Sequence, residues 1–411
     1  MKESVEEPRS KIWVAISAAV ILGLVGAYWM ATLSGEGQHI PQESLSKQLS
    51  WGSFDFGGQK YPVVYNREYV AINEDVVSLD LFLPVFSPDR AAVNPAQPRI
   101  VVENKRALFY FDVPGEYYLD INRGHKLKVV VLDRHEEIST NVLRVFDFLV
   151  ANLVVTQGND KEFYENNENY AIDFFKSKEP KMLLCGPTVS FFEIILRDRF
   201  NLPVRDVTFT GVFIEGGRLA YGTHNVVEVF LPDMSKWVLF DLNNGFVAKW
   251  MDAFEITEKV RSVSQSKKNI SKTEFESIDV DFHYLVDAKR TMNAFDPRSV
   301  FYPDMVTRES VRERWHDLAK IFLGGPGYWG GKRFNQNGLP LEYQLYASRY
   351  HQDEFLLEAQ RRWQDNWDLK VRHVPPAQLK QMLDDAYAEE ISARKWLEYL
   401  PKPILHAAAS R

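Results

Sequence analysis

Cysteine is almost absent from this sequence, which contains only Cys185 in 411 residues. An internal disulfide is therefore excluded, and the fold cannot be a small scaffold held together by cystines. A lone cysteine is most often a small buried hydrophobe, so any function for it has to be argued from its neighbours in the sequence. The length and an apolar fraction of 45% are sufficient for two or three domains, each with its own core.

An excess of positive charge is also absent. The 49 Lys and Arg residues are outnumbered by 56 Asp and Glu, which gives a formal net charge of -7. Such a chain has no general attraction to phosphate backbones, so nucleic acid is not an expected partner. The nine histidines show neither an H-E-x-x-H spacing nor a pairing with cysteine, and we expect no metal and no cofactor. No repeat of fixed period is visible, which argues against solenoids and propellers.

Charged residues are missing from one long segment, residues 12–33. A helix of this length rises about 1.5 Å per residue and crosses roughly 30 Å of hydrocarbon, so we expect a single-pass membrane anchor. Basic residues gather in residues 1–11, which predicts a cytoplasmic N-terminus and an extracytoplasmic, periplasmic remainder at the inner membrane. A cleaved signal peptide is the alternative, but the run is long for one and Trp29 disfavours cleavage near Ala31.

Beyond the predicted anchor, residues 34–50 are polar and form a linker. Residues 51–135 contain short strand-like runs separated by turns such as Pro114-Gly115, a spacing typical of a small β-sandwich. We interpret this module as a spacer, with sugar or protein binding as the alternative. The predicted strands are 61–65, 76–86, 99–102, 108–113, 117–121 and 127–132.

A mixed α and β domain is predicted for residues 136–285, with apolar residues at helical spacing in 137–151 and 161–175. Residues 286–411 are predicted to be a helical C-terminal region. Within it, the glycine-rich residues 324–331 are interpreted as a surface loop, although its two aromatic residues could instead stack on a ligand or cover the site. The predicted helices of this region are 308–323, 342–368 and 376–399.

Cys185 precedes a Gly-Pro-Thr-Val sequence that opens an amphipathic helix reaching about Phe200. Proline is accepted in a first helical turn, where its missing N–H would have no helical partner. The thiol is therefore predicted to lie at a helix N-terminus. Unpaired N–H groups and the positive end of the helix dipole stabilise a thiolate there, which lowers the pKa of the cysteine and makes it nucleophilic.

A thiolate nucleophile for acyl transfer needs a histidine to carry the proton and a third group to orient the imidazole. Residues 226–230 and 236–242 are strand-like and are joined by residues 231–235, which have good turn chemistry. If Val229 pairs with Lys236, His224 stands opposite Asp241 on one face. Opposite residues have Cβ atoms about 5 Å apart, which suits a carboxylate–imidazole hydrogen bond.

These segments resemble the core of the transglutaminase-like superfamily, in which a cysteine opens a helix and a histidine and an aspartate lie on neighbouring strands. The resemblance covers about residues 180–248. The similar motifs are LPVR at 202–205, HNVVEVF at 224–230 and WVLFD at 237–241. The separations of 39 residues (224 minus 185) and 17 residues (241 minus 224) match compact bacterial members. The resemblance implies an α+β fold with a papain/transglutaminase-like core and a catalytic triad of Cys185, His224 and Asp241.

The sequence departs from the family's pattern at Leu184, at Asn225 and at Leu242-Asn243-Asn244. The triad is intact, so the departures concern substrate and activity. Glu228 shares a face with His224, where it supports the site or forms an ordinary salt bridge. The contrary interpretation of the triad is a buried cysteine, an ordinary strand histidine and an aspartate that caps a turn.

The resemblance implies a cysteine peptidase or acyltransferase that forms a thioester on Cys185, with water or an amine as acceptor. We expect an extracytoplasmic peptide or cell-envelope substrate, and maturation of a partner in an envelope assembly is a second enzymatic possibility. A catalytically idle, membrane-tethered scaffold is the alternative from another class. Partners in an envelope complex or a homo-oligomer are expected. Small residues recur every four positions in the apolar segment, at Ala15, Ala19, Gly23 and Ala27, and could pack two helices together. Coincidence is the alternative explanation, because alanine is common in such helices.

Overall fold

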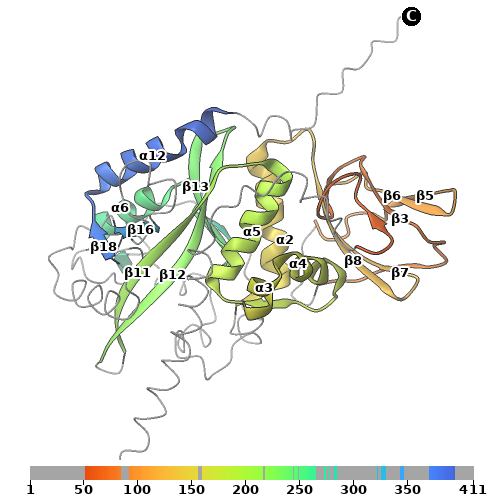
Figure 1. Cartoon of the computed structure of the whole chain (residues 1–411), viewed down its shortest axis with the longest axis horizontal. Helices are drawn as coiled ribbons and strands as arrows, with labels where there is room; N and C mark the ends of the chain where they lie inside the picture. Colours follow the sequence, from red (N-terminus) through yellow and green to blue (C-terminus); the bar gives the residue numbers. More distant parts are fainter. Residues whose placement is uncertain are drawn as a thin grey trace, which may run out of the picture.

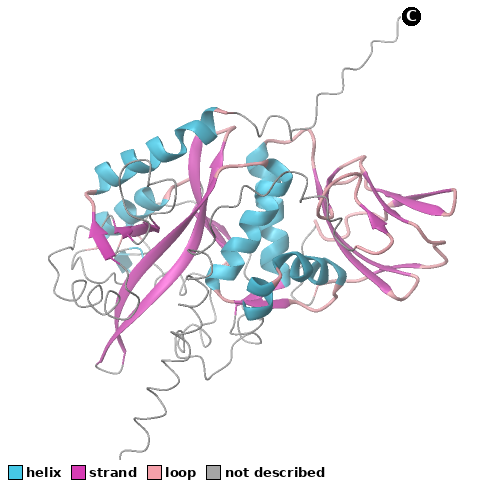
Figure 2. Cartoon of the chain, in the orientation of Figure 1, coloured by secondary structure: helices cyan, strands magenta, loops and turns pink. Residues whose placement is uncertain are grey.

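The fold is a mixed assembly of sheets and helices, shown in the computed structural model of Figures 1 and 2. The described residues of its first part, 51–84 and 92–132, form short strands in two four-stranded sheets. One sheet has the order β1 (Phe54–Asp55), β3 (Tyr69–Ile72), β6 (Arg106–Tyr110) and β5 (Arg99–Glu103). The other has the order β2 (Val63–Tyr65), β8 (His125–Leu132), β7 (Gly115–Ile121) and β4 (Leu79–Leu81). The residues that the structure describes are 51–84, 92–155, 160–215, 218–243, 245–248, 250–264, 273–274, 277, 282–284, 322, 325–329, 343–346 and 370–393.

Four of the described helices lie between this β-module and the largest sheet (Figure 1). They are α2 (Ile138–Asn152), α3 (Asp160–Glu165), α4 (Asn167–Lys176) and α5 (Cys185–Phe200). Between α2 and α5 run two short parallel strands, β9 (Leu153–Val155) and β10 (Lys181–Leu183). The single helix predicted for 161–175 is two helices, because the Asn166 side chain accepts the N–H of Asn169 and caps α4.

Among the described residues, the largest sheet has eight strands, and a long hairpin lies at its centre. In order across the sheet, its strands are β15 (Phe282–Tyr284), β14 (Phe246–Ala248), β13 (Lys236–Asp241), β12 (Arg218–Leu231), β11 (Val204–Glu215), β16 (Pro326–Trp329), β17 (Tyr343–Tyr346) and β18 (Lys370–His373). Strands far apart in sequence are therefore neighbours, because β16 pairs directly with β11.

The two faces of this sheet belong to two hydrophobic cores. Alternate residues of β12 and β13, such as Val227, Val229 and Phe240, join the core formed with α2 and α5. Their neighbours in the strands, such as Val226 and Leu239, join the core beneath α6 (Ala253–Val263) and α12 (Pro376–Ser392). This alternation is what the two-residue period of a strand requires when both faces of the sheet are covered.

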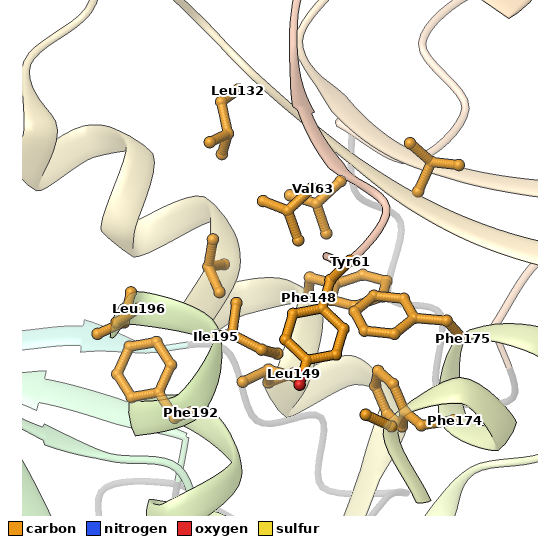
Figure 3. Packing of buried hydrophobic residues seen from close by; sticks show 14 of the residues in the cluster. Tyr61, Val63, Leu132, Phe148, Leu149, Phe174, Phe175, Phe192, Ile195 and Leu196 are labelled. Atoms are coloured by element: carbon orange, nitrogen blue, oxygen red, sulfur yellow. The ribbon is translucent and has the colours of Figure 1, made fainter. Parts of the chain in front are cut away.

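The first core also extends into the β-module. Figure 3 shows Tyr61 and Val63 of the module packed near the aromatic residues of α2 and α4. The rings of Tyr61 and Phe175 stack at 6.0 Å between centroids. The module therefore shares apolar contacts with the helical layer, and its role as a spacer stays a prediction.

The predicted fold class needs two corrections. Within the described residues, no helix combines the length and the apolar character needed to cross a membrane. The predicted membrane helix at 12–33 and the linker at 34–50 lie outside the described residues. The C-terminal region is not wholly helical, because it supplies β16, β17 and β18 to the largest sheet.

Individual elements of that region are also strands where the sequence predicted a loop or a helix. The predicted surface loop at 324–331 contains β16, and Tyr328 is 2% exposed. The start of the predicted helix 342–368 is strand β17, and the remaining residues of that helix lie outside the described part. Of the predicted helix 308–323 only residue 322 is described, whereas 376–399 contains α12.

Candidate active site

Cys185 is the first residue of α5, as the Gly-Pro-Thr-Val sequence predicts. The N-cap residue, Leu184, offers no side-chain hydrogen bond to the helix, and the first turn contains no acidic residue. The positive end of the helix dipole is therefore not neutralised by a side chain of its own first turn. Cys185 is half-buried.

The Phe146, Phe192 and Phe240 side chains fix the position of α5 against the sheet. They come from α2, α5 and β13, and the centroids of each pair of rings are 5.6–6.2 Å apart. All three rings are fully buried. Because Phe240 immediately precedes Asp241, this contact places the N-terminal half of α5 and the end of β13 in one rigid unit.

The register of β12 and β13 differs by two residues from the prediction. Val229 pairs with Val238 rather than with Lys236, and the last pair of the ladder is Val227 with Phe240. A shift of two residues keeps every side chain on its predicted face, since the period of a strand is two. His224 and Asp241 are consequently diagonal neighbours on one face rather than directly opposite, a separation that these two side chains span.

His224 and Asp241 form a buried, charge-assisted hydrogen bond. The distance between His224 Nε2 and Asp241 Oδ2 is 2.6 Å, and the two side chains are 3% and 0% exposed. The second ring nitrogen, Nδ1, is left for the sulfur of Cys185, with which the imidazole is also hydrogen-bonded. The structure thus brings the three predicted residues together in the order Cys185, His224, Asp241; their catalytic roles stay predictions.

The surroundings of the pair favour a thiolate and an imidazolium. Burial opposes charge on Cys185, but His224 and the backbone N–H groups of Asn225 and Gly186 lower the pKa of the thiol below its ordinary value. Burial also opposes the charge on His224, but the Asp241 carboxylate and the Cys185 sulfur raise the pKa of the imidazole to about 10. An ion pair of this kind is a nucleophile prepared for acyl transfer near neutral pH.

Asn225 contributes more to the site than the sequence indicated. Besides its backbone N–H, its side-chain oxygen accepts the Thr208 hydroxyl at 2.9 Å, which turns its amide nitrogen toward Gly186. A Cβ atom built on Gly186 would lie 3.4 Å from that nitrogen and 3.5 Å from the Tyr164 hydroxyl. The site around the thiol is therefore lined by polar groups from β12 and α3. In the sequence, this contact is indicated by Asn225 itself, which stands where the transglutaminase-like pattern usually has a small residue.

Glu228 lies on the same face of β12 as His224 but does not reach the triad. Its carboxylate accepts Arg205 Nε at 2.6 Å, the backbone N–H of Ala253 at 2.6 Å and the Tyr328 hydroxyl at 2.9 Å. Glu228 is 0% exposed. Of the two predicted roles, the contacts favour a structural one, in which Glu228 joins β11, β12, β16 and the start of α6.

Comparison of the sequence with models of known protein families and with curated proteins found no match. In the described part of the chain, no group of three or more His, Cys, Asp or Glu side chains is arranged to hold a metal ion. What this site does therefore has to be argued from its own geometry.

Proposed function

We propose that the chain is a cysteine-dependent acyl-transfer enzyme that cleaves an amide or peptide bond through a thioester. The observation that supports this most directly is the hydrogen-bonded series of Cys185, His224 and Asp241 at an uncapped helix N-terminus. A structural cysteine needs none of these partners. The transglutaminase-like resemblance in the sequence points to the same chemistry.

In the proposed first step, the Cys185 thiolate attacks the carbonyl carbon of the substrate and forms a C–S bond, while the carbonyl oxygen becomes an oxyanion. The His224 imidazolium donates its Nδ1 proton to the departing amine nitrogen as the C–N bond breaks. The products are a thioester and a free amine. Asp241 holds the ring in position and stabilises its positive charge throughout.

In the second step, neutral His224 accepts a proton from water or from an acceptor amine, which attacks the thioester. The C–S bond then breaks, and the Cys185 thiolate returns with either a carboxylic acid or a new amide as product. The Cys185 backbone N–H is the proposed first donor to the oxyanion. We propose a peptide or cell-envelope substrate; the extracytoplasmic location stays a prediction, because it depends on residues that the structure does not describe.

Alkylation with iodoacetamide tests the nucleophile, and it is unambiguous because Cys185 is the only cysteine. We expect the wild-type protein to react at pH 6.5 at least about 10-fold faster than free cysteine, because a larger fraction of its sulfur is thiolate. The rate is measured by mass spectrometry of the intact chain. The variant His224→Ala should lose this advantage, since the imidazolium is one source of the lowered pKa.

His135→Ala is the matched control, because His135 is exposed and lies outside the site. Its labelling rate should equal that of the wild-type protein. Labelling no faster than free cysteine and unaffected by His224→Ala would refute the proposal and favour the idle scaffold. Capture of a thioester on Cys185 from a peptide or envelope extract, detected as a mass adduct removed by hydroxylamine, would support turnover.

A further inference from the structure

Strand β5 lies at an edge of the β-module, as the described residues show it, and its sequence is unusual for an edge strand. Strand β5, with sequence RIVVE, pairs only with β6 in the described part of the chain, and the β5–β6 hairpin projects away from the helical layer (Figure 1). Ile100 is 37% and Val102 60% exposed on this strand. Exposed apolar residues on an open edge form a ready template for another strand.

The two exposed side chains continue the apolar inner face of the module. Ile100 pairs with Phe109 and Val102 with Ala107, and both partners are fully buried in the core. Because paired residues point to the same face, Ile100 and Val102 extend this face past the point where it is covered.

The turn that follows β5 determines which backbone groups face outward. Asn104 and Lys105 both have positive φ, 51° and 63°, which defines a two-residue hairpin turn. Glu103 and Arg106 flank the turn and exchange backbone hydrogen bonds, and the pattern then alternates along the ladder. The N–H and C=O groups of Ile100 and Val102 therefore point to the open edge.

The charges of β5 are self-complementary when the strand is reversed. Antiparallel pairing of two copies about a two-fold axis at Val101 places Arg99 of one copy opposite Glu103 of the other. The same axis places Ile100 opposite Val102, the two residues whose backbone groups are directed outward. About four backbone hydrogen bonds form in this register, and Val101 meets its own copy as a non-hydrogen-bonded pair.

From these observations we infer that β5 is a homodimer interface, in which two copies of this chain pair their β5 strands antiparallel about Val101 and join their modules into one continuous sheet. A two-fold axis makes the contact closed, so it produces a dimer and no larger fibre. Five residues on each side bury less than about 1,200 Å², so the dimer is of the weak, concentration-dependent class. This inference is independent of the proposed catalytic activity.

Disulfide trapping in the full-length chain tests the register. In a Cys185→Ser background, Val101→Cys places the two new thiols opposite each other in a non-hydrogen-bonded pair, with Cα atoms about 4.5 Å apart, within disulfide range. Mild oxidation should give a dimer on a non-reducing gel. Ile100→Cys is the control, because its copies are diagonal neighbours about 7–8 Å apart, and its dimer yield should be at least about five-fold lower.

Charge reversal separates specific pairing from random collision. When Arg99→Glu is added to Val101→Cys, the new acidic side chain at position 99 of one copy lies opposite Glu103 of the other. The repulsion should reduce the disulfide yield at least about five-fold. Adding Glu103→Arg restores opposite charges and should restore the yield, while circular dichroism checks that each variant is folded. Equal yields from Val101→Cys and Ile100→Cys, or a yield that charge reversal leaves unchanged, would overturn the inference, as would the absence of any trapped dimer.

Discussion

Lys128 lies in the shared core between the β-module and α4, where a charged group is costly. Its side chain is 0% exposed. The ammonium lies 4.6 Å from the centroid of the Phe174 ring, and its hydrogen bond to the Glu179 carbonyl oxygen is long, at 3.5 Å. Burial, with a smaller contribution from the charge of Lys181, lowers the pKa of Lys128 from 10.5 to about 7. We predict that Lys128→Met stabilises the protein.

The size and sign of the effect follow from this pKa. A difference of 10.5 minus about 7 corresponds to about 5 kcal/mol at 1.36 kcal/mol per pKa unit. Between these two pH values the unfolded chain binds a proton that the folded chain does not, so stability rises with pH from about 7 to 10.5. Below about pH 7 the free-energy cost of burying the charged Lys128 side chain reaches its full value. After subtracting about 2 kcal/mol for the lost cation–π contact and hydrogen bond, Lys128→Met should gain about 3 kcal/mol at pH 6.

Urea unfolding followed by tryptophan fluorescence at pH 6, 7.5 and 9 measures this gain. It should be largest at pH 6 and shrink as the pH rises. Lys126→Met is the matched control on the same strand, because Lys126 pairs with Asp120 near the surface, and its effect should stay within about 1 kcal/mol. If Lys128→Met destabilises the protein most strongly at pH 6, the ring and the carbonyl stabilise the charge, and the argument from desolvation is refuted.

Two further substitutions test the site and its support. Asp241→Asn removes the charge that stabilises the imidazolium, so iodoacetamide labelling of Cys185 at pH 6.5 should slow about 10-fold or more; an unchanged rate would contradict the role given to Asp241. Glu228→Gln leaves the Arg205 guanidinium buried without its carboxylate and should lower the unfolding free energy in urea by about 3 kcal/mol. The exposed control Glu136→Gln should change the unfolding free energy by less than about 1 kcal/mol. Equal losses of unfolding free energy from the two substitutions would contradict the structural role given to Glu228.

The helices α2 and α5, which support the site, were predicted from local sequence signals. The predicted helix at 137–151 is α2 at Ile138–Asn152, and the helix that begins at Cys185 ends at Phe200. The first has strong apolar periodicity and the second has proline in its first turn, so in both helices local sequence and tertiary packing favour the same structure. The hairpin of β12 and β13 was also predictable, because its turn residues separate two apolar runs.

The register of β12 with β13 and the C-terminal strands could not be predicted from the sequence. Two registers that differ by two residues place the same side chains on the same face, so the apolar pattern alone does not distinguish them. Strand β16 has the sequence PGYW, whose proline and glycine indicate a turn. It is a strand because its pairing with β11 and the hydrogen bond that the Tyr328 hydroxyl donates to Glu228 outweigh the local preference of this sequence for a turn.

This last contact changes the role of the C-terminal region in the proposed mechanism. Glu228 and His224 lie four residues apart on one strand, and Tyr328, Arg205 and the start of α6 hold Glu228 from the face opposite α5. The other face of the same strand packs on the core of α5, which carries the thiol. The distance between sulfur and imidazole therefore depends on both cores, and a short contact of this kind tolerates little displacement. A chain cut after residue 264 would lose β16 and should lose rapid Cys185 labelling even if α5 remains folded.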